Sequence, residues 1–370
     1  MKRTKKRQIT ILGIRGIPAQ HGGFETFAEY LSYYLVNRDW KVTIYCQEEG
    51  SGSIYVTEWK DVKRIHIPVK NNGPLGTIIF DLKSILHSLR YSGVFLTLGY
   101  NTAIFNLLFR IFAKRNIINM DGIEWKRQKW GLIAKTWFWL NERIGCWFGN
   151  HLIADHPEIK SHLSTRISEN KITVIPYGSD LIREANIEHI KKMGLDENGY
   201  CLIVARPEPE NSLLEIVKAF SSEKRHKKLI VLGDMEPTIK EYHEIVMNSA
   251  SDEVIFPGAI YEKEVVEALR YYSLVYIHGH QVGGTNPSLV EALGAGSPVI
   301  AHDNKFNRWV IGDEGSFFKN ENELSQKFDE LLDNSKKLFE LAELSSDRHQ
   351  TIFTWPDVLG QYERLLERWL

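Results

Sequence analysis

The residues best placed to carry out chemistry lie in one run of small and polar side chains, His278-Gly-His-Gln-Val-Gly-Gly-Thr-Asn-Pro-Ser-Leu-Val-Glu291. Asn286 is a good helix N-cap, and Pro287 suits the first helical position, where its missing N–H costs nothing. The free amides around Gly284, Thr285 and Asn286 then form an anion site at the positive end of a helix. Glu291 follows just over one turn later, where its carboxylate could accept the two hydroxyls of a ribose. A capped helix with Glu291 on its solvated surface is the alternative, and the spacing favours the nucleotide site.

A second glycine-rich run follows an apolar segment and reads Gly13-Ile-Arg-Gly-Ile-Pro-Ala-Gln-His-Gly-Gly-Phe-Glu25. It is not the dinucleotide fingerprint, because no Gly-x-Gly-x-x-Gly spacing directly opens a helix. The run instead ends in Gly22 and Gly23, whose bare amides at a helix start can approach a phosphate closely. A flexible loop that needs glycine for its turn explains the same residues equally well.

A third candidate run, Ala205-Arg-Pro-Glu-Pro-Glu-Asn-Ser212, comes directly after another apolar segment. Arg206 carries a planar guanidinium suited to phosphate oxygens, and either Asn211 or Ser212 can cap the following helix. An arginine that faces a second anion site suggests a diphosphate held from two sides. A surface arginine is the alternative.

Acidic residues follow two further apolar segments. Asp121 and Glu124 lie in Asn119-Met-Asp-Gly-Ile-Glu-Trp-Lys-Arg127, and Asp155 lies in Ala154-Asp-His-Pro157. Such carboxylates could orient sugar hydroxyls or take a proton from an acceptor hydroxyl. The alternatives are an ordinary Asp-Gly turn at Asp121 and a helix cap at Asp155.

The hydrophobic pattern predicts the elements that must position these residues. Strand-like and helical segments alternate in two successive halves, which predicts an α/β protein with two doubly wound, parallel-sheet domains. We expect these domains to span 1–182 and 183–354, with a C-terminal helix over 355–370 that joins the first. The predicted strands are 8–12, 41–46, 64–68, 94–98, 116–120, 152–154, 171–175, 201–205, 228–232, 254–256, 274–278 and 298–301. The predicted helices include 24–35, 78–89, 101–114, 211–220, 237–248, 262–271 and 286–295. Because ligands of open parallel sheets bind beyond the carboxyl ends of the strands, each candidate run lies where a ligand is expected.

Composition excludes several classes of protein. The 370 residues contain 46 Lys plus Arg and 47 Asp plus Glu, and this net charge of −1 argues against a nucleic-acid binder. Three scattered cysteines form no disulfide framework or metal-binding pair, and the absence of an Asp-x-Asp triplet predicts that no metal is used. The basic start, Met1–Arg7, is followed by Ile9-Thr-Ile-Leu12, and these four residues are too few for the apolar region of a signal peptide. The uncharged stretch 92–109 splits into a strand and a helix capped by Asn101 or Thr102, so we do not expect it to span a membrane.

Together these runs resemble the retaining nucleotide-sugar glycosyltransferases of family 4, whose GT-B fold has two Rossmann-like domains facing across a cleft. Within this family the chain is most similar to the bacterial rhamnosyltransferase group whose N-terminal half has been a domain of unknown function. The resemblance covers nearly the whole chain. It rests on Gly16-Ile-Pro with Gly22-Gly-Phe-Glu25, Asp121–Arg127, Arg206–Asn211 and His278–Glu291.

The resemblance implies roles for the donor-binding residues. Glu291 matches the second glutamate of the family's Glu-x7-Glu motif and would bind the ribose. Residues from both domains would contact the rest of the donor, above all its phosphates: Gly22, Gly23, Arg206, Asn211, His280, Gly284, Thr285 and Asn286.

Three positions depart from the family pattern. Gly283 stands at the first glutamate of the motif, Asn211 at a phosphate-binding lysine, and Asp121 at a histidine beside the donor sugar. These changes are compatible with a deoxy sugar of L configuration, which needs different contacts from a hexose.

The resemblance implies transfer of L-rhamnose from dTDP-L-rhamnose to a lipid-diphosphate-linked sugar during surface polysaccharide assembly. It implies net retention, with the departing phosphate accepting the acceptor's proton, in an enzyme peripheral to the cytoplasmic face of the membrane. Asp121, Glu124 and Asp155 are the candidates for the acidic group that assists. The alternatives are a UDP- or GDP-hexose donor, a sugar-nucleotide 2-epimerase of the same fold, and a non-enzymatic nucleotide-sugar sensor.

Tryptophans are concentrated in one predicted helix. A stripe at spacings of three and four predicts the side that faces the core: Trp130, Ile133, Trp137, Leu140, Ile144 and Trp147. Another face, with its neighbours, suits an interface with anionic lipid: Lys126, Arg127, Lys129, Lys135, Trp139 and Arg143. An ordinary helix with a solvated side is the alternative.

Overall fold

The computed structural model describes residues 7–20, 22–70 and 73–370, which form two compact units. The first unit comprises the chain up to Lys126, Trp130–Pro176 and Trp355–Leu370, and the second comprises Arg127–Lys129 and Tyr177–Thr354. The boundary thus falls at 176/177, six residues before the expected 182. Residues 1–6, which make up most of the basic start, lie outside the described residues.

The first unit is built on an eight-stranded sheet. Its strands are β1 (Gln8–Leu12), β2 (Lys41–Glu49), β3 (Tyr55–Trp59), β4 (Val62–Val69), β5 (Val94–Leu98), β6 (Arg115–Asn119), β7 (His151–Ala154) and β8 (Ile172–Val174). Their order across the sheet is β3-β4-β2-β1-β5-β6-β7-β8. All neighbours are parallel except β3 and β4, which pair antiparallel at one edge; β4 matches the predicted strand 64–68, whereas the sequence analysis missed β3.

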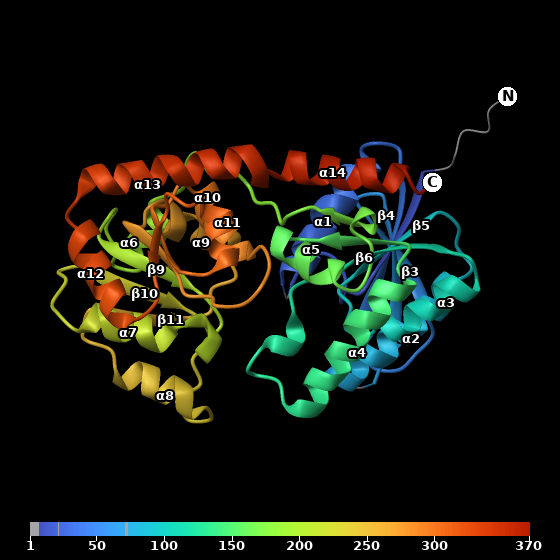
Figure 1. Cartoon of the computed structure of the whole chain (residues 1–370), viewed down its shortest axis with the longest axis horizontal. Helices are drawn as coiled ribbons and strands as arrows, with labels where there is room; N and C mark the ends of the chain where they lie inside the picture. Colours follow the sequence, from blue (N-terminus) through green and yellow to red (C-terminus); the bar gives the residue numbers. More distant parts are fainter. Residues whose placement is uncertain (1–6, 21, 71–72) are drawn as a thin grey trace. The chain divides into compact units, whose positions relative to one another are not determined.

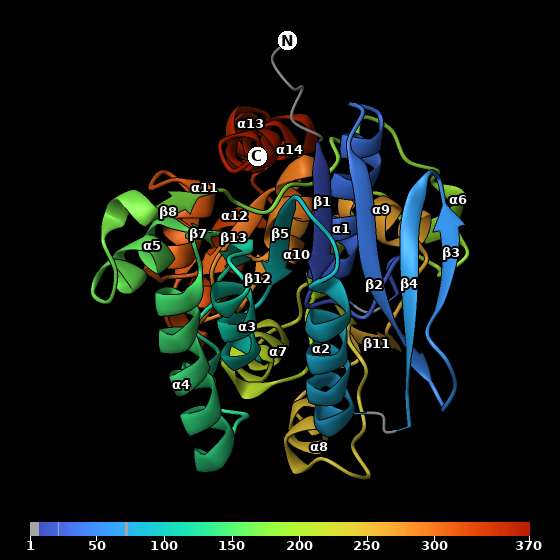
Figure 2. The ribbon, with the colours of Figure 1, turned by 90° about the vertical axis from the view of Figure 1, so that its right-hand side faces the viewer.

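Helices cover this sheet and connect its strands (Figure 1). They are α1 (Gly23–Val36), α2 (Pro74–Ser88), α3 (Leu107–Ile111), α4 (Leu132–Phe148), α5 (Pro157–Ser164) and α14 (Trp355–Glu367), with short turns η1 (Ala103–Asn106), η2 (Glu124–Lys126) and η3 (Glu169–Lys171). Helices α2, α3 and α4 lie side by side, as Figure 2 shows. Helix α14 packs against α1, where Tyr362 contacts the ring of Phe27 at 4.5 Å between centroids.

The second unit has a six-stranded, fully parallel sheet. Its strands are β9 (Tyr200–Val204), β10 (Lys228–Leu232), β11 (Val254–Gly258), β12 (Val275–His278), β13 (Val299–His302) and β14 (Ser316–Phe318). Their order across the sheet is β11-β10-β9-β12-β13-β14. Its helices are α6 (Glu188–Lys191), α7 (Leu213–Ser221), α8 (Glu241–Asn248), α9 (Lys263–Tyr271), α10 (Pro287–Gly294), α11 (Lys305–Ile311), α12 (Glu321–Leu331) and α13 (Ser335–Arg348), with η4 (Pro209–Asn211) and η5 (His349–Phe353). Cys201 and Ile203 of β9 enter one buried cluster and Leu202 enters another, which explains why the strand is apolar throughout.

The predicted fold class is confirmed: both units are α/β with doubly wound sheets. The predicted helix over 101–114 is wrong in extent, because η1 and the short α3 replace it. Neither expected cap forms, and the Thr102 hydroxyl instead donates to Oδ2 of Asp81 at 2.7 Å. Among the described residues, no helix is both long enough and apolar enough to cross a membrane.

The predicted core stripe of α4 is also wrong. Ile133, Leu140 and Trp147 are exposed, whereas the buried positions of this helix are Asn141, Glu142, Gly145 and Cys146. The spacing correctly indicates an amphipathic helix. Polar contacts inside the unit, however, hold the polar side of α4 inward and leave the predicted stripe outside.

Asp81 gives a prediction about stability. Burial raises the pKa of Asp81 to about 7, and the hydrogen bond from Thr102 opposes this shift only in part. The folded state therefore keeps a proton that the unfolded chain has lost, so the free energy of unfolding falls as pH rises from about 4 to about 7. Asp81→Asn should remove this fall and stabilise the first unit by about 2 kcal/mol above pH 7. Melting temperatures of both proteins below about pH 4 and above about pH 7 test this; an equal difference at both pH values would contradict it.

Candidate functional site

The glycine-rich run of the second unit joins β12 to α10 as predicted. The Asn286 side chain caps the helix by accepting from the Ser288 N–H at 3.0 Å, and Pro287 occupies the first turn. Thr285 is buried, and Gly283 has φ +149°, with no described atom beyond its two chain neighbours within 4 Å of the position that a Cβ would take. The start of α10 is therefore rigidly capped, and the space beside Gly283 is open.

Glu291 is not the solvated surface residue of the alternative interpretation. Its Oε2 lies 2.6 Å from Nη2 of Arg270, whose side chain is only 6% exposed, while the Glu291 side chain is 33% exposed. Arg270 lies in the last turn of α9, and its Nη2 also reaches Oγ of Ser288 at 3.5 Å. A buried guanidinium thus holds a partly exposed carboxylate in one place, as a hydroxyl-binding carboxylate requires. Sequence analysis missed Arg270 because no motif surrounds it.

The loop after β9 is braced against the loop after β12. Asn211 donates from Nδ2 to the carbonyl oxygen of Arg206 at 2.8 Å, and the Ser212 hydroxyl donates to that of Gly279 at 2.8 Å. Nε2 of Gln281 donates in turn to the Ser212 hydroxyl at 2.9 Å. The expected cap at Asn211 or Ser212 is therefore wrong, since neither side chain caps α7. The guanidinium of Arg206 is exposed beside this brace.

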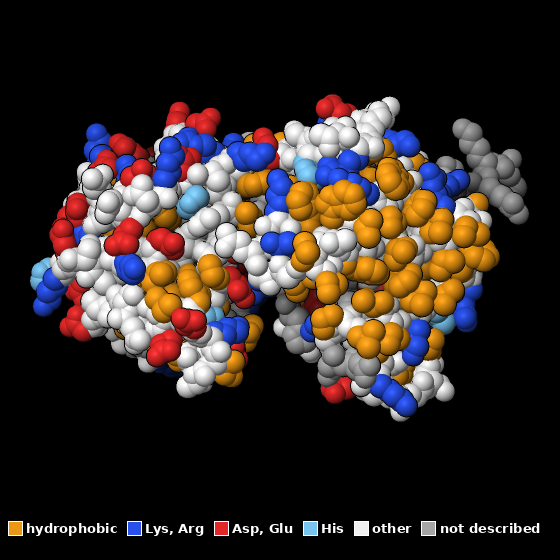
Figure 3. Space-filling view, turned by 60° about the horizontal axis from the view of Figure 1, so that its bottom comes forward, with side chains coloured by type: hydrophobic (Ala, Val, Ile, Leu, Met, Phe, Trp, Pro, Cys, Tyr) orange, Lys and Arg blue, Asp and Glu red, His pale blue; other side chains and the backbone are white. Residues whose placement is uncertain are grey.

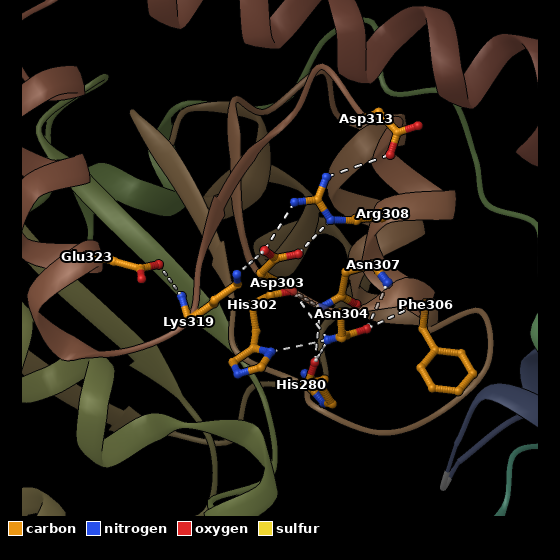
Figure 4. A network of polar contacts seen from close by, with 10 residues as sticks. All are labelled: His280, His302, Asp303, Asn304, Phe306, Asn307, Arg308, Asp313, Lys319 and Glu323. Carbon is orange, nitrogen blue, oxygen red and sulfur yellow. Dashed lines mark hydrogen bonds and ion pairs between the residues drawn. The ribbon is translucent and has the colours of Figure 1, made fainter.

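Two asparagine side chains hold the backbone of His280 in place, as Figure 4 shows. Its carbonyl oxygen accepts from Nδ2 of Asn304 and from Nδ2 of Asn307, each at 3.0 Å. Its ring stacks on that of His278 with 4.4 Å between centroids. Asn304 also caps α11, a helix that the sequence analysis did not predict although Asn is a favoured N-cap residue.

The imidazole of His280 is neutral. Burial, followed by the positive charges of Arg127 and Arg206, lowers its pKa to about 3. Within 7–20, 22–70 and 73–370, its Nδ1 has no hydrogen-bond partner, and neither ring nitrogen of the buried His278 has one. The two neutral imidazole rings therefore lie near the positive charges of Arg127 and Arg206, which suit an anion.

The second glycine-rich run opens α1 at Gly23, as predicted, with Gly22 as its N-cap residue. The carboxylate of Glu25 accepts from the Gln20 N–H at 2.9 Å, and that of Glu29 accepts from the Ala19 N–H at 2.8 Å. These bonds fold the loop after β1 back onto the helix. His21 lies outside the described residues.

Asp121 forms the Asp-Gly turn of the alternative interpretation. It has φ +55°, and its Oδ1 accepts from the Gly122 N–H at 2.8 Å. Its own N–H donates to Oδ1 of Asn119 at 3.0 Å. A turn does not exclude a role in chemistry, because a carboxylate has two oxygens, and that role stays a prediction.

The other two acidic candidates have different surroundings. Glu124 is buried, and its Oε2 accepts from Nε1 of Trp130 at 3.1 Å. Asp155 does not cap α5: the cap is the His156 ring, whose Nδ1 accepts from the Glu158 N–H at 3.0 Å. Because β6 and β7 are parallel neighbours, all three carboxylates follow the carboxyl edge of one sheet.

The part of the chain that the structure describes contains no group of three or more His, Cys, Asp or Glu side chains arranged to hold a metal ion.

Two families match successive parts of the chain. Residues 6–180 match a domain of unknown function, DUF1972, and residues 186–346 match glycosyl transferases group 1. Alpha-monoglucosyldiacylglycerol synthase from Streptococcus pneumoniae is 29% identical over 168 residues, which is 41% of this chain and 37% of that protein. The match therefore spans well under half of the relative's length.

Solved structures share the whole fold at low identity. Sucrose-phosphate synthase from Thermosynechococcus elongatus has a TM-score of 0.83 at 18% identity, covering 98% of each chain. Anabaena HepE in complex with UDP and glucose has a TM-score of 0.76 at 15% identity, covering 98% of this chain and 100% of that one.

The fold is that of the GT-B glycosyltransferases, and the two family matches together span most of the chain. Its first unit carries a DUF1972 domain, and its second unit carries a domain of glycosyl transferases group 1.

Proposed function

We propose that the protein is a retaining, metal-independent glycosyltransferase that moves L-rhamnose from dTDP-L-rhamnose to a lipid-diphosphate-linked sugar in surface polysaccharide synthesis. The observation that carries the proposal is the capped, glycine-rich start of α10, one turn before a carboxylate held by buried Arg270. This pairing suits the diphosphate and the ribose of one nucleotide.

Different residues of the second unit would bind different parts of the donor. Amides at the start of α10, together with the Arg206 guanidinium, would stabilise negative charge on the diphosphate as the sugar bond breaks. The neutral ring of His280 can donate one hydrogen bond there without adding charge. Glu291 would accept the ribose hydroxyls.

The choice of a deoxy sugar rests on Gly283, where a hexose transferase of the resembled family has a glutamate. Among the described residues, no atom beyond its two chain neighbours lies within 4 Å of the Cβ position at Gly283, so the space that a glutamate side chain would enter is open there. A UDP-hexose donor is the second candidate, favoured by the likeness to Anabaena HepE, which was solved with UDP and glucose.

A panel of donors tests the proposal. The full chain is incubated with dTDP-L-rhamnose, UDP-glucose or a GDP-hexose, with and without a lipid-diphosphate-linked acceptor, and products are identified by mass. Rhamnosylated lipid formed only with dTDP-L-rhamnose is the expected result. A hexosylated product would favour the second candidate, an epimerised donor without acceptor would indicate an epimerase, and binding without turnover would indicate a sensor.

We expect transfer to continue at an undiminished rate in EDTA, because amides and Arg206 would balance the diphosphate charge without a metal ion. Initial rates before and after dialysis against the chelator measure this. A rate that falls and is restored by magnesium would contradict metal independence.

A further inference from the structure

Helix α4 exposes its apolar side. Leu132 and Ile133 are 82% and 89% exposed, and Trp139, Leu140 and Trp147 are exposed along the same helix. Its inward side is polar or small instead. Large apolar side chains left in water on one helix indicate an interaction surface rather than a folding core.

Polar contacts fix this orientation. The buried carboxylate of Glu142 accepts from Nε1 of Trp125 at 2.9 Å and lies 3.0 Å from both Nε2 of His162 and Nη2 of Arg166. Burial raises the pKa of Glu142, but the bonds with His162 and Trp125 and the nearby positive charge outweigh it and lower the pKa overall. Turning α4 over would therefore leave an ionised carboxylate without these partners.

The apolar surface extends beyond α4 because α4 packs against η1 and α3. Figure 3 shows hydrophobic side chains gathered over this part of the first unit, with Lys and Arg among them. We call this surface the α3–α4 face, and its exposed apolar residues are Ile104, Leu107, Ile111, Phe112, Leu132, Ile133, Trp139, Leu140 and Trp147.

The charges around the α3–α4 face have one sign. In the part of 101–150 that belongs to the first unit, all of it described, the basic residues are Arg110, Lys114, Arg115, Lys126, Lys135 and Arg143. The acidic residues there are Asp121, Glu124 and Glu142, of which the first is half-buried and the others are buried. Every fully exposed charge in this stretch is therefore positive, and it complements an anionic surface.

We propose that the α3–α4 face docks on a bilayer of anionic phospholipid, with Leu132 and Ile133 inserted at the boundary of the acyl chains. The inference rests on the proposed function, in which the acceptor is lipid-linked. Phospholipid suits the face better than a second copy of the chain, because a symmetric dimer would oppose two positive surfaces. Tryptophans such as Trp139 and Trp147 suit the depth of the headgroups.

Docking in this way would bring the acceptor to the acidic residues. Leu132 begins α4 on the side of the sheet where β6 ends, which is also the side of Asp121 and Glu124. A sugar carried on a lipid embedded beside Leu132 would therefore start near that edge of the first unit.

Vesicle binding tests the proposal. The full chain is sedimented with vesicles of phosphatidylglycerol and phosphatidylcholine, and with vesicles of phosphatidylcholine alone. We expect binding to the anionic vesicles that weakens with added salt. The double variant Leu132→Gln/Ile133→Gln should bind about tenfold less, because two inserted apolar side chains are lost. Ile239→Gln, at a 78% exposed position of the second unit, is the matched control and should bind like the wild type.

The outcomes separate docking from the proposed function. Equal binding to both vesicle types, or an unaltered double variant with its melting temperature preserved, would overturn the docking. A concentration-dependent dimer that the double variant abolishes would assign the face to a second copy and would also overturn it. Transfer to a water-soluble diphosphate-sugar acceptor should be unchanged in the double variant. Absence of that transfer in the wild type would count against the proposed function alone.

Discussion

Glu291→Ala is expected to raise the KM for the donor by about tenfold or more and to lower the free energy of unfolding by about 2 kcal/mol. The first effect follows from losing the carboxylate proposed to hold the ribose, before and during the reaction alike. The second follows because Arg270, only 6% exposed, would keep a buried charge without its partner.

The double variant Arg270→Met/Glu291→Ala separates these two effects. Replacing the guanidinium with an apolar side chain removes the uncompensated charge, so stability should recover. The donor KM should stay high, because the ribose-binding carboxylate is still absent. Donor KM and chemical unfolding measured on both variants decide the matter, and recovery of both quantities in the double variant would leave Glu291 with a structural role only.

Asp121→Asn is expected to lower turnover by about a hundredfold with little change in melting temperature. Asparagine tolerates the left-handed conformation at φ +55° and can accept the same hydrogen bond from the Gly122 N–H. The substitution therefore removes the charge and keeps the turn. If the Asp121 carboxylate orients an acceptor hydroxyl or stabilises positive charge on the sugar ring, its loss lowers turnover directly.

Asp121→Ala is the companion variant for this turn. It loses both the charge and the turn, so we expect the turnover of Asp121→Asn together with a lower melting temperature. Turnover and melting are measured on the same preparations. Near-wild-type turnover in Asp121→Asn would reject the role of Asp121 and direct the search to Glu124 or Asp155.

The fold could be predicted because the alternation of strand-like and helical apolar segments directly indicates which residues are buried and in which kind of element. The cap at Asn286 and the first-turn Pro287 were likewise predictable, since each depends on its own neighbours in the chain. Arg270 was not, because its partner Glu291 lies 21 positions away and only the packing of α9 near α10 brings them together.

Helix α4 shows a different limit. Spacing reveals that a helix has two unlike sides but not which side faces inward. Here the inward side is chosen by Glu142, whose partners His162 and Arg166 lie about twenty residues further along. The same limit applies at Ser212, whose hydroxyl bonds a neighbouring loop rather than its own helix.

The return of α14 to the first unit has a consequence for the order of events during synthesis. Tyr362 packs on Phe27, and its hydroxyl accepts a 2.7 Å hydrogen bond from Nδ2 of Asn119, yet it follows the second unit in the chain. The ribosome therefore synthesises the second unit before the first unit can complete its core. Until α14 has been synthesised, the nascent chain must carry an open hydrophobic surface over α1.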